Sequence, residues 1–316
     1  MRIVSPSVEL LPEPKTPEDV LRHIEACGRV CYRSEDRITD GSAEKFVRMI
    51  IKRGHEAVLE HARITLTMES GIDRAYTRVV RDEMRSMGIC DYLTGSHWGR
   101  LVSGNIRAWR AFLAFAHKMC LSMPETYARM VEGYPSLFED LRLEMPEALQ
   151  TKIHIPEPMT RSEREMHGWH TLRFVCDRGV SHEIVRHRPA SYCQESTRYC
   201  NYSEDRFGGE IACVEPFFFS PGTRAYDIWL GNCETAEQAY FTLLDEGATA
   251  QEARGVLPTD LKTEIVMTAD NPEWLHFLKL RTGEAAHPKM RLLAREAGRL
   301  LAEKDPEIFG EYGGKA

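Results

Sequence analysis

Two short segments that alternate between apolar and polar side chains restrict the fold of this chain more than any other feature. They are residues 63–68 and 171–176. Alternation with a period of two is typical of a half-buried strand, because successive side chains of a strand point to opposite faces. We expect these two strands to be neighbours in one sheet, although the residues 69–170 lie between them.

Helices with clear start signals accompany these strands. Thr16 and Pro17 form a cap and a first-turn proline ahead of a helix over 17–31, and Asn271 and Pro272 do the same for a later helix. Further helices are expected over 42–54, 105–120, 226–246, 249–258 and 288–304, and further strands over 2–10, 210–219 and 262–268. Strands and helices mixed without strict βαβ alternation indicate an α+β fold, with a mixed or antiparallel sheet packed against helices.

The order of these patterns predicts a divided domain. We expect residues 1–70 and 170–316 to form one catalytic domain and 71–169 to form a large, mainly helical insertion of unknown role. The tail of that insertion, 144–165, carries three prolines and mixed charge, so we expect a loop there. The sequence contains no recognisable internal repeat.

The charge and cysteine content exclude several classes of protein. The 41 basic and 48 acidic residues give a net charge of −7, which argues against nucleic acid or membrane lipid as the main partner. The nine cysteines are odd in number and form no C-x-x-C pair, so neither a disulfide framework nor a structural zinc site is indicated. With no leader segment and no apolar run long enough to span a membrane, we expect a soluble, cytoplasmic protein.

One basic cluster stands out in this acidic chain. Arg186, His187 and Arg188 are followed by Ser196 and Arg198, with only Glu195 to oppose them. Arginine matches phosphate oxygens two at a time, so the cluster indicates a site for a nucleotide or a dinucleotide cofactor. The alternative from local sequence is a solvated or ion-paired helix end.

The amino-acid sequence of this segment matches a known family signature. Residues 186–199, Arg-His-Arg-Pro-Ala-Ser-Tyr-Cys-Gln-Glu-Ser-Thr-Arg-Tyr, resemble the signature of flavin-dependent thymidylate synthases, an Arg-His-Arg followed by seven residues and a Ser. The resemblance extends over roughly 17–70 and 170–305. It implies a homotetramer with active sites built from several subunits. It also implies formation of dTMP from dUMP, with FAD as cofactor, methylenetetrahydrofolate as carbon donor and NADPH as reductant.

The same resemblance assigns residues to the two ligands. Arg281 is expected to be catalytic, because a guanidinium at the N3/O2 edge of uracil stabilises negative charge on the pyrimidine. The expected dUMP-binding residues are Glu183, Arg186, Gln194, Glu195, Ser196, Thr197, Arg198, Arg254 and Arg281. The expected FAD-binding residues are His55, Arg186, His187, Arg188, Gln194, Asp270 and His276. The chain departs from the commonest family pattern at four positions. Cys193 and Asp270 stand where Asn is frequent, Glu183 where Gln is frequent and Pro272 where Arg is frequent.

Other chemistries compete for the same residues. The segment Gly54-His55-Glu56-Ala57-Val58-Leu59-Glu60-His61 resembles a metal site, but a bundle-type dimetal site needs a Glu-x-x-His from each of two helices, so we expect no metal. His182 and His187 are five residues apart, which is wrong for a zinc protease helix.

Two alternatives concern the chemistry itself. Cys193 is a candidate nucleophile, but free cysteines are mostly small buried hydrophobes, so we expect it to be a packing residue. A rival function is a catalytically inactive nucleotide- or RNA-binding regulatory protein that retains the basic pocket. A flavin absorption band in the purified protein would favour the enzyme.

Overall fold

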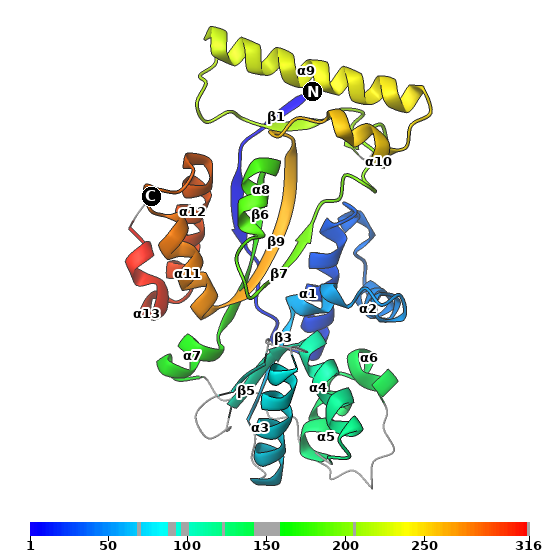
Figure 1. Ribbon diagram of the computed structural model, residues 1–316, viewed down its shortest axis with the longest axis vertical. Coiled ribbons are helices and arrows are strands. Elements are labelled where there is room, and N and C mark those ends of the chain that lie inside the picture. The colour runs from blue at the N-terminus through cyan, green and yellow to red at the C-terminus, as the bar shows by residue number, and fades with distance from the viewer. Residues whose placement is uncertain are drawn as a thin grey trace.

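The chain forms three tiers along its long axis (Figure 1). The computed structural model describes residues 1–67, 71–87, 93–95, 101–121, 124–141, 159–204 and 207–314. A four-stranded sheet with its helices occupies the middle, a long helix with two short strands lies at one end, and a lobe with a second sheet lies at the other. Helices and small, largely antiparallel sheets are packed together, so the predicted α+β class is confirmed.

The middle sheet is antiparallel throughout. Its order is β2 (Ser7–Leu10), β6 (Trp169–Asp177), β9 (Lys262–Asp270) and β7 (Ala190–Gln194). Helices α11 (Asn271–Arg281) and α12 (Pro288–Lys304) cover one face, and α1 (Pro17–Val30) packs against the other.

Side chains of this sheet alternate between the two helical layers. Ile265 and Met267 of β9 face α11 and α12, whereas Val266 between them contacts α1. In β7, likewise, Tyr192 lies on the side of α11 and α12, whereas Cys193 contacts α1. A strand buried on both faces therefore places neighbouring residues in different chemical surroundings.

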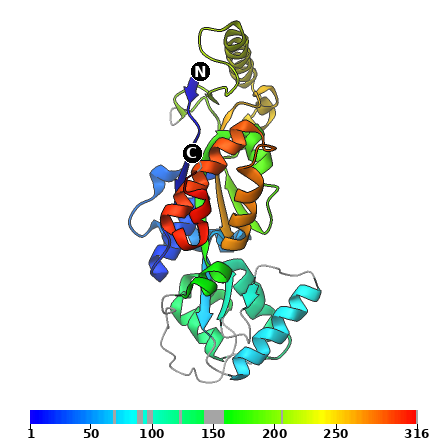
Figure 2. The same ribbon diagram turned by 90° about the vertical axis from the view of Figure 1, so that its left-hand side faces the viewer.

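The lower lobe has its own sheet and core (Figure 2). Its strands are β3 (Arg63–Thr67), β5 (Leu101–Asn105) and β4 (Leu93–Gly95), in that order. Trp109 and Phe112 of α4 are fully buried in its core. The surrounding helices are α2 (Ser42–Lys52), α3 (Gly71–Ser86), α4 (Ile106–Lys118), α5 (Pro124–Gly133) and α6 (Pro135–Phe138).

The expectation that 63–68 and 171–176 are neighbours in one sheet is wrong. β3 pairs with β5, which comes from the segment between the two, while β6 pairs with β2 and β9. Periodicity predicts that a segment is a strand, but strand partners are set by contacts distant in sequence.

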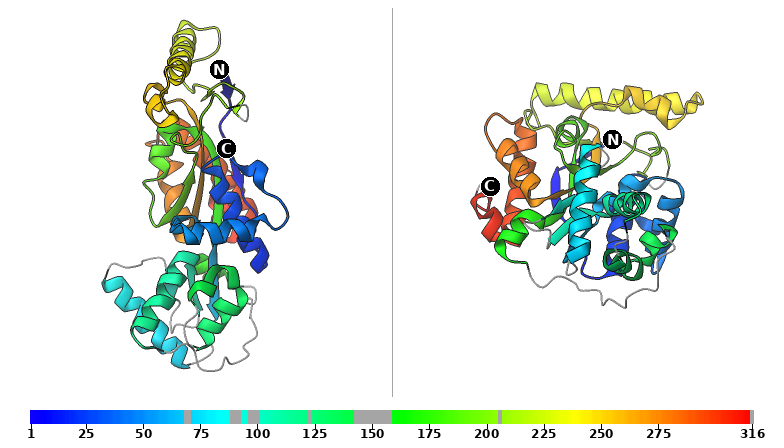
Figure 3. Two further views of the ribbon diagram at one scale, coloured as in Figure 1. Left: turned by 90° about the vertical axis from the view of Figure 1, so that its right-hand side faces the viewer. Right: turned by 60° about the horizontal axis from the view of Figure 1, so that its bottom comes forward.

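The upper tier is built from segments that flank the middle sheet (Figure 3). β1 (Arg2–Val4) pairs in parallel with β8 (Ala212–Val214). Above them runs α9 (Arg224–Asp245), which buries Trp229, Cys233 and Tyr240. α10 (Ala250–Ala253) and the 3₁₀ turn η6 (Arg254–Val256) lead from α9 back to β9.

Local start signals were predicted more accurately than strand extents. Thr16 caps α1 with a capping box to Asp19, as expected, whereas α11 is capped by Asp270 and not by Asn271. The strand expected over 2–10 is two strands, and that over 210–219 is β8 alone. Residues 161–165 lie in α7 (Arg161–His167), not in a loop, and the preceding 144–158 fall outside the described residues.

Several short elements complete the chain. They are η1 (Glu35–Arg37), η2 (Glu56–His61), η4 (Glu139–Leu141), α8 (Arg178–Ile184), α13 (Pro306–Phe309) and η7 (Gly310–Tyr312). Within the described part of the chain, none of the helices combines the length and the apolar character needed to cross a membrane.

Candidate functional site

The basic signature occupies the turn between α8 and β7 and continues along β7. Tyr192 holds this turn, because its hydroxyl shares one proton between two carbonyl oxygens, that of Ile184 at 2.9 Å and that of His187 at 2.7 Å. The Arg188–Pro189 peptide bond is cis. A strand paired to the central β9 therefore presents the signature residues from a fixed backbone.

The guanidiniums of the signature point to solvent. Arg186, Arg188 and Arg198 are exposed, and among the described residues neither Arg186 nor Arg188 has a side-chain hydrogen bond or ion pair. Arg198 lies over the ring of Tyr199, with its guanidinium carbon 5.4 Å from the ring centroid. Among the described residues these two arginines therefore do not form an ion-paired helix end. Their exposure is common to a solvated helix end and to an anion site, which arginine suits by its planar fork.

Arg281, at the end of α11, is anchored to the last turn of α8 and to the signature itself. Its NH1 donates to Glu183 Oε2 at 2.7 Å, and its Nε donates to His187 Nε2 at 2.9 Å. The exposed fraction of the Arg281 side chain is 17%, so the side chain is mostly shielded from water. Three residues that the sequence assigned to ligand binding therefore lie in direct contact.

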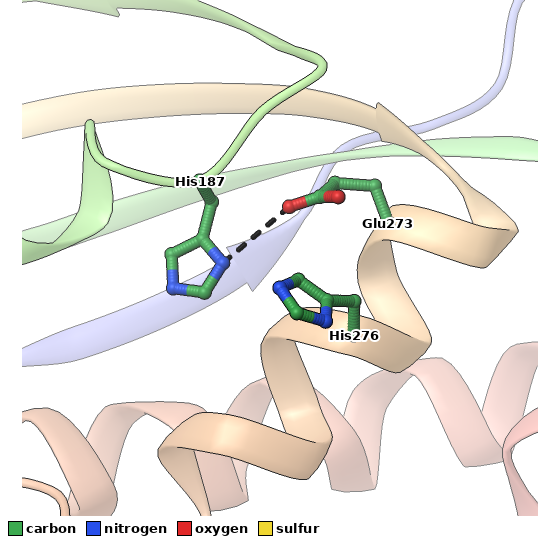
Figure 4. A group of neighbouring side chains, drawn as sticks. All are labelled: His187, Glu273 and His276. Atoms are coloured by element: carbon green, nitrogen blue, oxygen red, sulfur yellow. Dashed lines mark ion pairs between the residues drawn. The ribbon is translucent and has the colours of Figure 1, made fainter.

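His187 also faces two residues of α11, and the three side chains could form a metal site (Figure 4). Its Nδ1 lies 3.4 Å from Oε1 of Glu273, and its ring centroid lies 5.8 Å from that of the exposed His276. However, Nε2 of His187 accepts a hydrogen bond from Arg281, so the neutral ring carries its proton on Nδ1. A protonated Nδ1 cannot bind a metal, and it lies 3.4 Å from the carboxylate of Glu273 without a hydrogen bond between them.

The next residues of β7 differ in their access to a ligand. Gln194 is half-buried, and its amide donates to Ser181 Oγ at 2.9 Å and to Thr263 Oγ1 at 3.2 Å. Glu195 is buried and accepts from Lys262 Nζ at 3.0 Å and from Tyr202 Oη at 3.1 Å. Both oxygens of Glu195 thus have internal partners, whereas its assignment to the nucleotide stays a prediction.

Cys193 has the surroundings of a packing residue. It is buried between β7 and α1, in a cluster with Cys27, Val30 and Val266. A hydrogen bond with the Cys31 thiol, burial and neighbouring charge together raise the pKa of Cys193 well above its ordinary value. The thiol therefore stays protonated near neutral pH, which is the reverse of what nucleophilic catalysis requires.

The two glutamates of η2 are held by arginines of α4. Glu56 lies 3.3 Å from Arg110 NH2, and Oε1 of Glu60 lies 2.6 Å from Arg107 NH1. The other oxygen of Glu60 accepts from Ser191 Oγ of β7 at 3.0 Å. These carboxylates therefore serve as ion-pair and hydrogen-bond partners that join η2, α4 and β7.

The remaining predicted site residues lie around this centre. His55, exposed, directly precedes η2, and Asp270 accepts from the Glu273 backbone N–H at 3.1 Å as the cap of α11. Ser196 and Thr197 follow β7 and are half-buried. Arg254 is exposed in η6, and within the described residues no contact joins its side chain to the signature.

Sequence reasoning missed two residues of this site. Glu273 faces His187, and its one local signal is its position three residues before His276 on a helix, which puts both on one face. Glu60 bridges Arg107 and Ser191, residues of distant segments. Neither contact follows from local periodicity, because the partners are brought together only by the fold.

Comparison with known proteins places this geometry in context. The sequence profile of the family described as "Thymidylate synthase complementing protein" matches residues 15–86 and 163–307. A flavin-dependent thymidylate synthase of Geobacter sulfurreducens is 37% identical over 136 residues, which is 43% of this chain and 57% of that protein. One of Pyrococcus furiosus is 32% identical over 130 residues, 41% of this chain and 52% of that protein.

These matches span little more than half the length of the curated relatives. Among solved structures, a UMP/dUMP methylase PolB from Streptomyces cacaoi, bound with 5-Br dUMP, aligns over 100% of this chain and 99% of its own. The TM-score is 0.42 and the sequence identity is 16%, a superposition too loose to carry a structural inference.

Proposed function

The chain belongs to the family of flavin-dependent thymidylate synthases, and from this premise we propose that it methylates dUMP to dTMP. In this proposal methylenetetrahydrofolate supplies the carbon, NADPH supplies the reducing equivalents and FAD is the cofactor. We further propose that the enzyme is a homotetramer with shared active sites and works in the cytoplasm.

The observation that carries the proposal is the contrast between two kinds of arginine. Arg186 and Arg188 are exposed cations without internal carboxylate partners, which suits them to phosphate or pyrophosphate oxygens. Arg281, in contrast, is shielded and held by Glu183 and His187. The two exposed arginines would bind phosphate groups, and the held Arg281 would bind the reacting base. Such a combination suits a nucleotide substrate whose base is modified.

The donor set around the signature fits a flavin dinucleotide. Arg186, Arg188 and the exposed His55 would hold FAD, and Gln194 would lie between cofactor and nucleotide. Ser196, Arg198 and Arg254 would bind the phosphate of dUMP. When bound, the flavin supplies hydride transfer, which no protein side chain provides.

Arg281 would act on the pyrimidine itself. Methylation at C5 requires a nucleophilic carbon, and negative charge that develops on the ring is stabilised by a guanidinium at its N3/O2 edge. Glu183 and His187 hold that guanidinium before substrate arrives, so little reorganisation is needed during the reaction. The protonated, buried Cys193 supports a route without an enzyme thiolate.

The test is NADPH-dependent formation of dTMP by the purified, FAD-loaded protein with methylenetetrahydrofolate. We expect a yellow protein whose dTMP formation requires FAD, NADPH and methylenetetrahydrofolate, each of them. A colourless protein that cannot take up added FAD would contradict the proposal and favour a nucleotide-binding regulatory protein that lacks catalysis.

A further inference from the structure

The lower and middle sheets have the same topology, with corresponding strands and helices in the same order. In the lower lobe the order is β3, α3, β4, β5, α4. In the middle tier it is β6, α8, β7, β9, α11, with β8, α9, α10 and η6 of the upper tier between β7 and β9. In both sheets the last strand of the series lies between the other two and is antiparallel to them. We call β3 to α4, with the preceding η2, the first unit, and β6 to α11, with the preceding α7, the second unit.

Equivalent atoms make equivalent contacts in the two units. The N–H of Ile106 donates to the carbonyl of Ala62 at 3.0 Å, and that of Asn271 donates to Gly168 at 3.0 Å. The registers Arg63 with Asn105 and Trp169 with Asp270 correspond, and Asn105 and Asp270 both cap the helix that follows.

The helix cores correspond as well. The indole of Trp109 donates to the carbonyl of Ile64 at 3.0 Å, and the indole of Trp274 donates to that of His170 at 3.0 Å. Trp109 with Phe112 and Trp274 with Phe277 both meet edge to face, at 5.4 Å and 82°. Matching sheet order, caps and ring geometry establish an internal repeat, which the sequence alone did not reveal.

The two units contact each other reciprocally. Nδ1 of His61, in the first unit, lies 2.8 Å from Thr268 Oγ1 of the second. Nδ1 of His167, in the second unit, lies 2.9 Å from Ser103 Oγ of the first. His61 corresponds to His167 and Ser103 to Thr268, so each unit gives the other the same contact. Such an exchange is the mark of a two-fold interface.

A two-fold relation creates two equivalent interfaces, and only one of them carries the signature. There η2 of the first unit lies against β7 of the second, and Glu60 accepts from Ser191 at 3.0 Å. At the other interface the second unit presents α7, in which Met166 takes the place of Glu60. Among the described residues, the contact between η2 and the signature strand is therefore made by both units.

Arg107 is the first unit's cation at this interface. It lies in the first turn of α4, and its NH1 is 2.6 Å from the Glu60 oxygen opposite the one that holds Ser191. Two hydrogen bonds, through Glu60, therefore connect the guanidinium to Ser191 of β7, and the exposed Arg188 lies three residues before Ser191 in the chain. Its side chain is 53% exposed, and its counterpart in the second unit is Pro272.

We propose that Arg107 binds the pyrophosphate of the flavin cofactor, as the contribution of the first unit to the signature of the second. This inference rests on the proposed function. Glu60 and Ser191 connect the guanidinium to the strand that follows Arg186 and Arg188 in the chain. Glu60 balances one of these three cations, so a net positive charge is left for an anion. Arginine's planar fork matches two oxygens of a pyrophosphate.

The experiment compares four proteins: the parent, Arg107→Ala, the double variant Arg107→Ala with Pro272→Arg, and Arg22→Ala. Arg22 is the matched control, because it is 58% exposed and pairs with Glu18 on α1, away from the signature. Affinity for FAD is measured by titration of the apoprotein, and affinity for dUMP is measured separately by calorimetry.

We expect Arg107→Ala to weaken FAD binding about ten- to a hundredfold, the effect of losing one charge-assisted contact, with dUMP affinity changed less than threefold. Pro272→Arg should not restore FAD binding, because Pro272 lies beside α7 at the other interface, where Asn271 donates to the Arg164 carbonyl at 2.9 Å. Arg22→Ala should behave as the parent.

The outcomes separate the two proposals. If the parent binds FAD and Arg107→Ala binds it equally well, the role of Arg107 is overturned and the proposed function stands. Recovery of FAD binding by Pro272→Arg would overturn the assignment of Arg107 to one interface. If the parent binds FAD but forms no dTMP, the proposed function fails while the Arg107 titrations still decide its role. A parent that takes up no FAD would overturn both.

Discussion

Arg281 donates its Nε proton to Nε2 of His187 at 2.9 Å and thereby fixes the tautomer of that imidazole. The single N–H of the neutral ring is then on Nδ1, which lies 3.4 Å from the carboxylate of Glu273 without a hydrogen bond between them. Carboxylate, imidazole and guanidinium form a row that ends at Glu183. The cation proposed for the pyrimidine is therefore oriented from both sides by the protein itself.

Arg281→Lys tests this orientation. Lysine keeps the charge but lacks the planar fork that reaches Glu183 and His187 together, so we expect turnover at saturating dUMP to fall at least tenfold. Steady-state dTMP formation over a range of dUMP concentrations measures kcat and KM separately. An unchanged kcat would remove Arg281 from the mechanism.

The same tautomer predicts how the protein responds to metals. Because Nδ1 of His187 carries a proton, the group of His187, Glu273 and His276 should not bind Zn²⁺ at micromolar concentration, although its ligand atoms lie within 4.8 Å of one another. We expect activity to survive EDTA and dialysed protein to contain no stoichiometric metal by elemental analysis. Zinc binding that disappears in His276→Ala would show that the tautomer is wrong.

Arg198→Ala should separate the two ligands. Its exposed guanidinium is proposed to bind the dUMP phosphate, so its loss should weaken dUMP affinity about ten- to a hundredfold, which corresponds to about 1.5–3 kcal/mol. FAD retention should be unaffected. Calorimetry with dUMP and the flavin absorbance of the purified variant provide the two readings. An equal loss of both ligands would indicate that Arg198 supports the fold and not the nucleotide.

Cys193→Ala distinguishes the two chemical routes to thymidylate. The pKa of the buried Cys193 thiol is raised by its hydrogen bond with Cys31, so the thiolate is not available as a nucleophile. We expect the folded, flavin-loaded variant to form dTMP within a few fold of the parent. A loss of several powers of ten in a variant that retains FAD would assign the nucleophile to Cys193 and overturn the flavin route.

Acid should destabilise the protein through two buried histidines. Burial lowers the pKa of His61 from 6.5 to about 3 and that of His23 from 6.5 to about 4. The unfolded chain therefore takes up these protons near pH 6.5, whereas the folded chain stays neutral until about pH 4 to 3. Stability is fully present above pH 6.5 and falls as the pH falls, by at least about 1.4 kcal/mol for each histidine.

Urea unfolding at pH 7 and at pH 5 measures this loss. His61→Asn should be less stable than the parent at pH 7, because it loses the contact with Thr268, but its stability should depend less on pH. Equal pH dependence in the two proteins would show that His61 is not the group responsible.

Features set by neighbouring residues were predicted well. The expected helix over 288–304 coincides with α12, and Thr16 caps α1, because caps and first-turn prolines act within a few residues. The partner of β3 was not predicted, since pairing with β5 depends on residues about forty positions away. The internal repeat escaped notice because insertions change its spacing, and its identical positions, such as Trp109 and Trp274, are few.

In the candidate site, too, features set by neighbouring residues were predicted and those set by distant contacts were not. The signature is a local motif, so its arginines are identified from the sequence alone, and their assignment to ligands stays a prediction. Glu60 and Glu273 were not assigned to the site, because each acquires its role from a partner on a distant element, Ser191 for the first and His187 for the second. Local sequence predicts which charges a segment carries, and the fold decides which of them face each other.

The fusion of two equivalent units into one chain changes what a single mutation does. In an assembly of identical subunits every substitution appears at both symmetry-related positions. A substitution that improves ligand binding at one interface therefore also alters the stability of the other. Here Arg107 and Pro272 occupy equivalent positions and differ completely. The chain is free to specialise one interface for ligands while the other diverges, and the two units cannot separate on dilution because the backbone joins them.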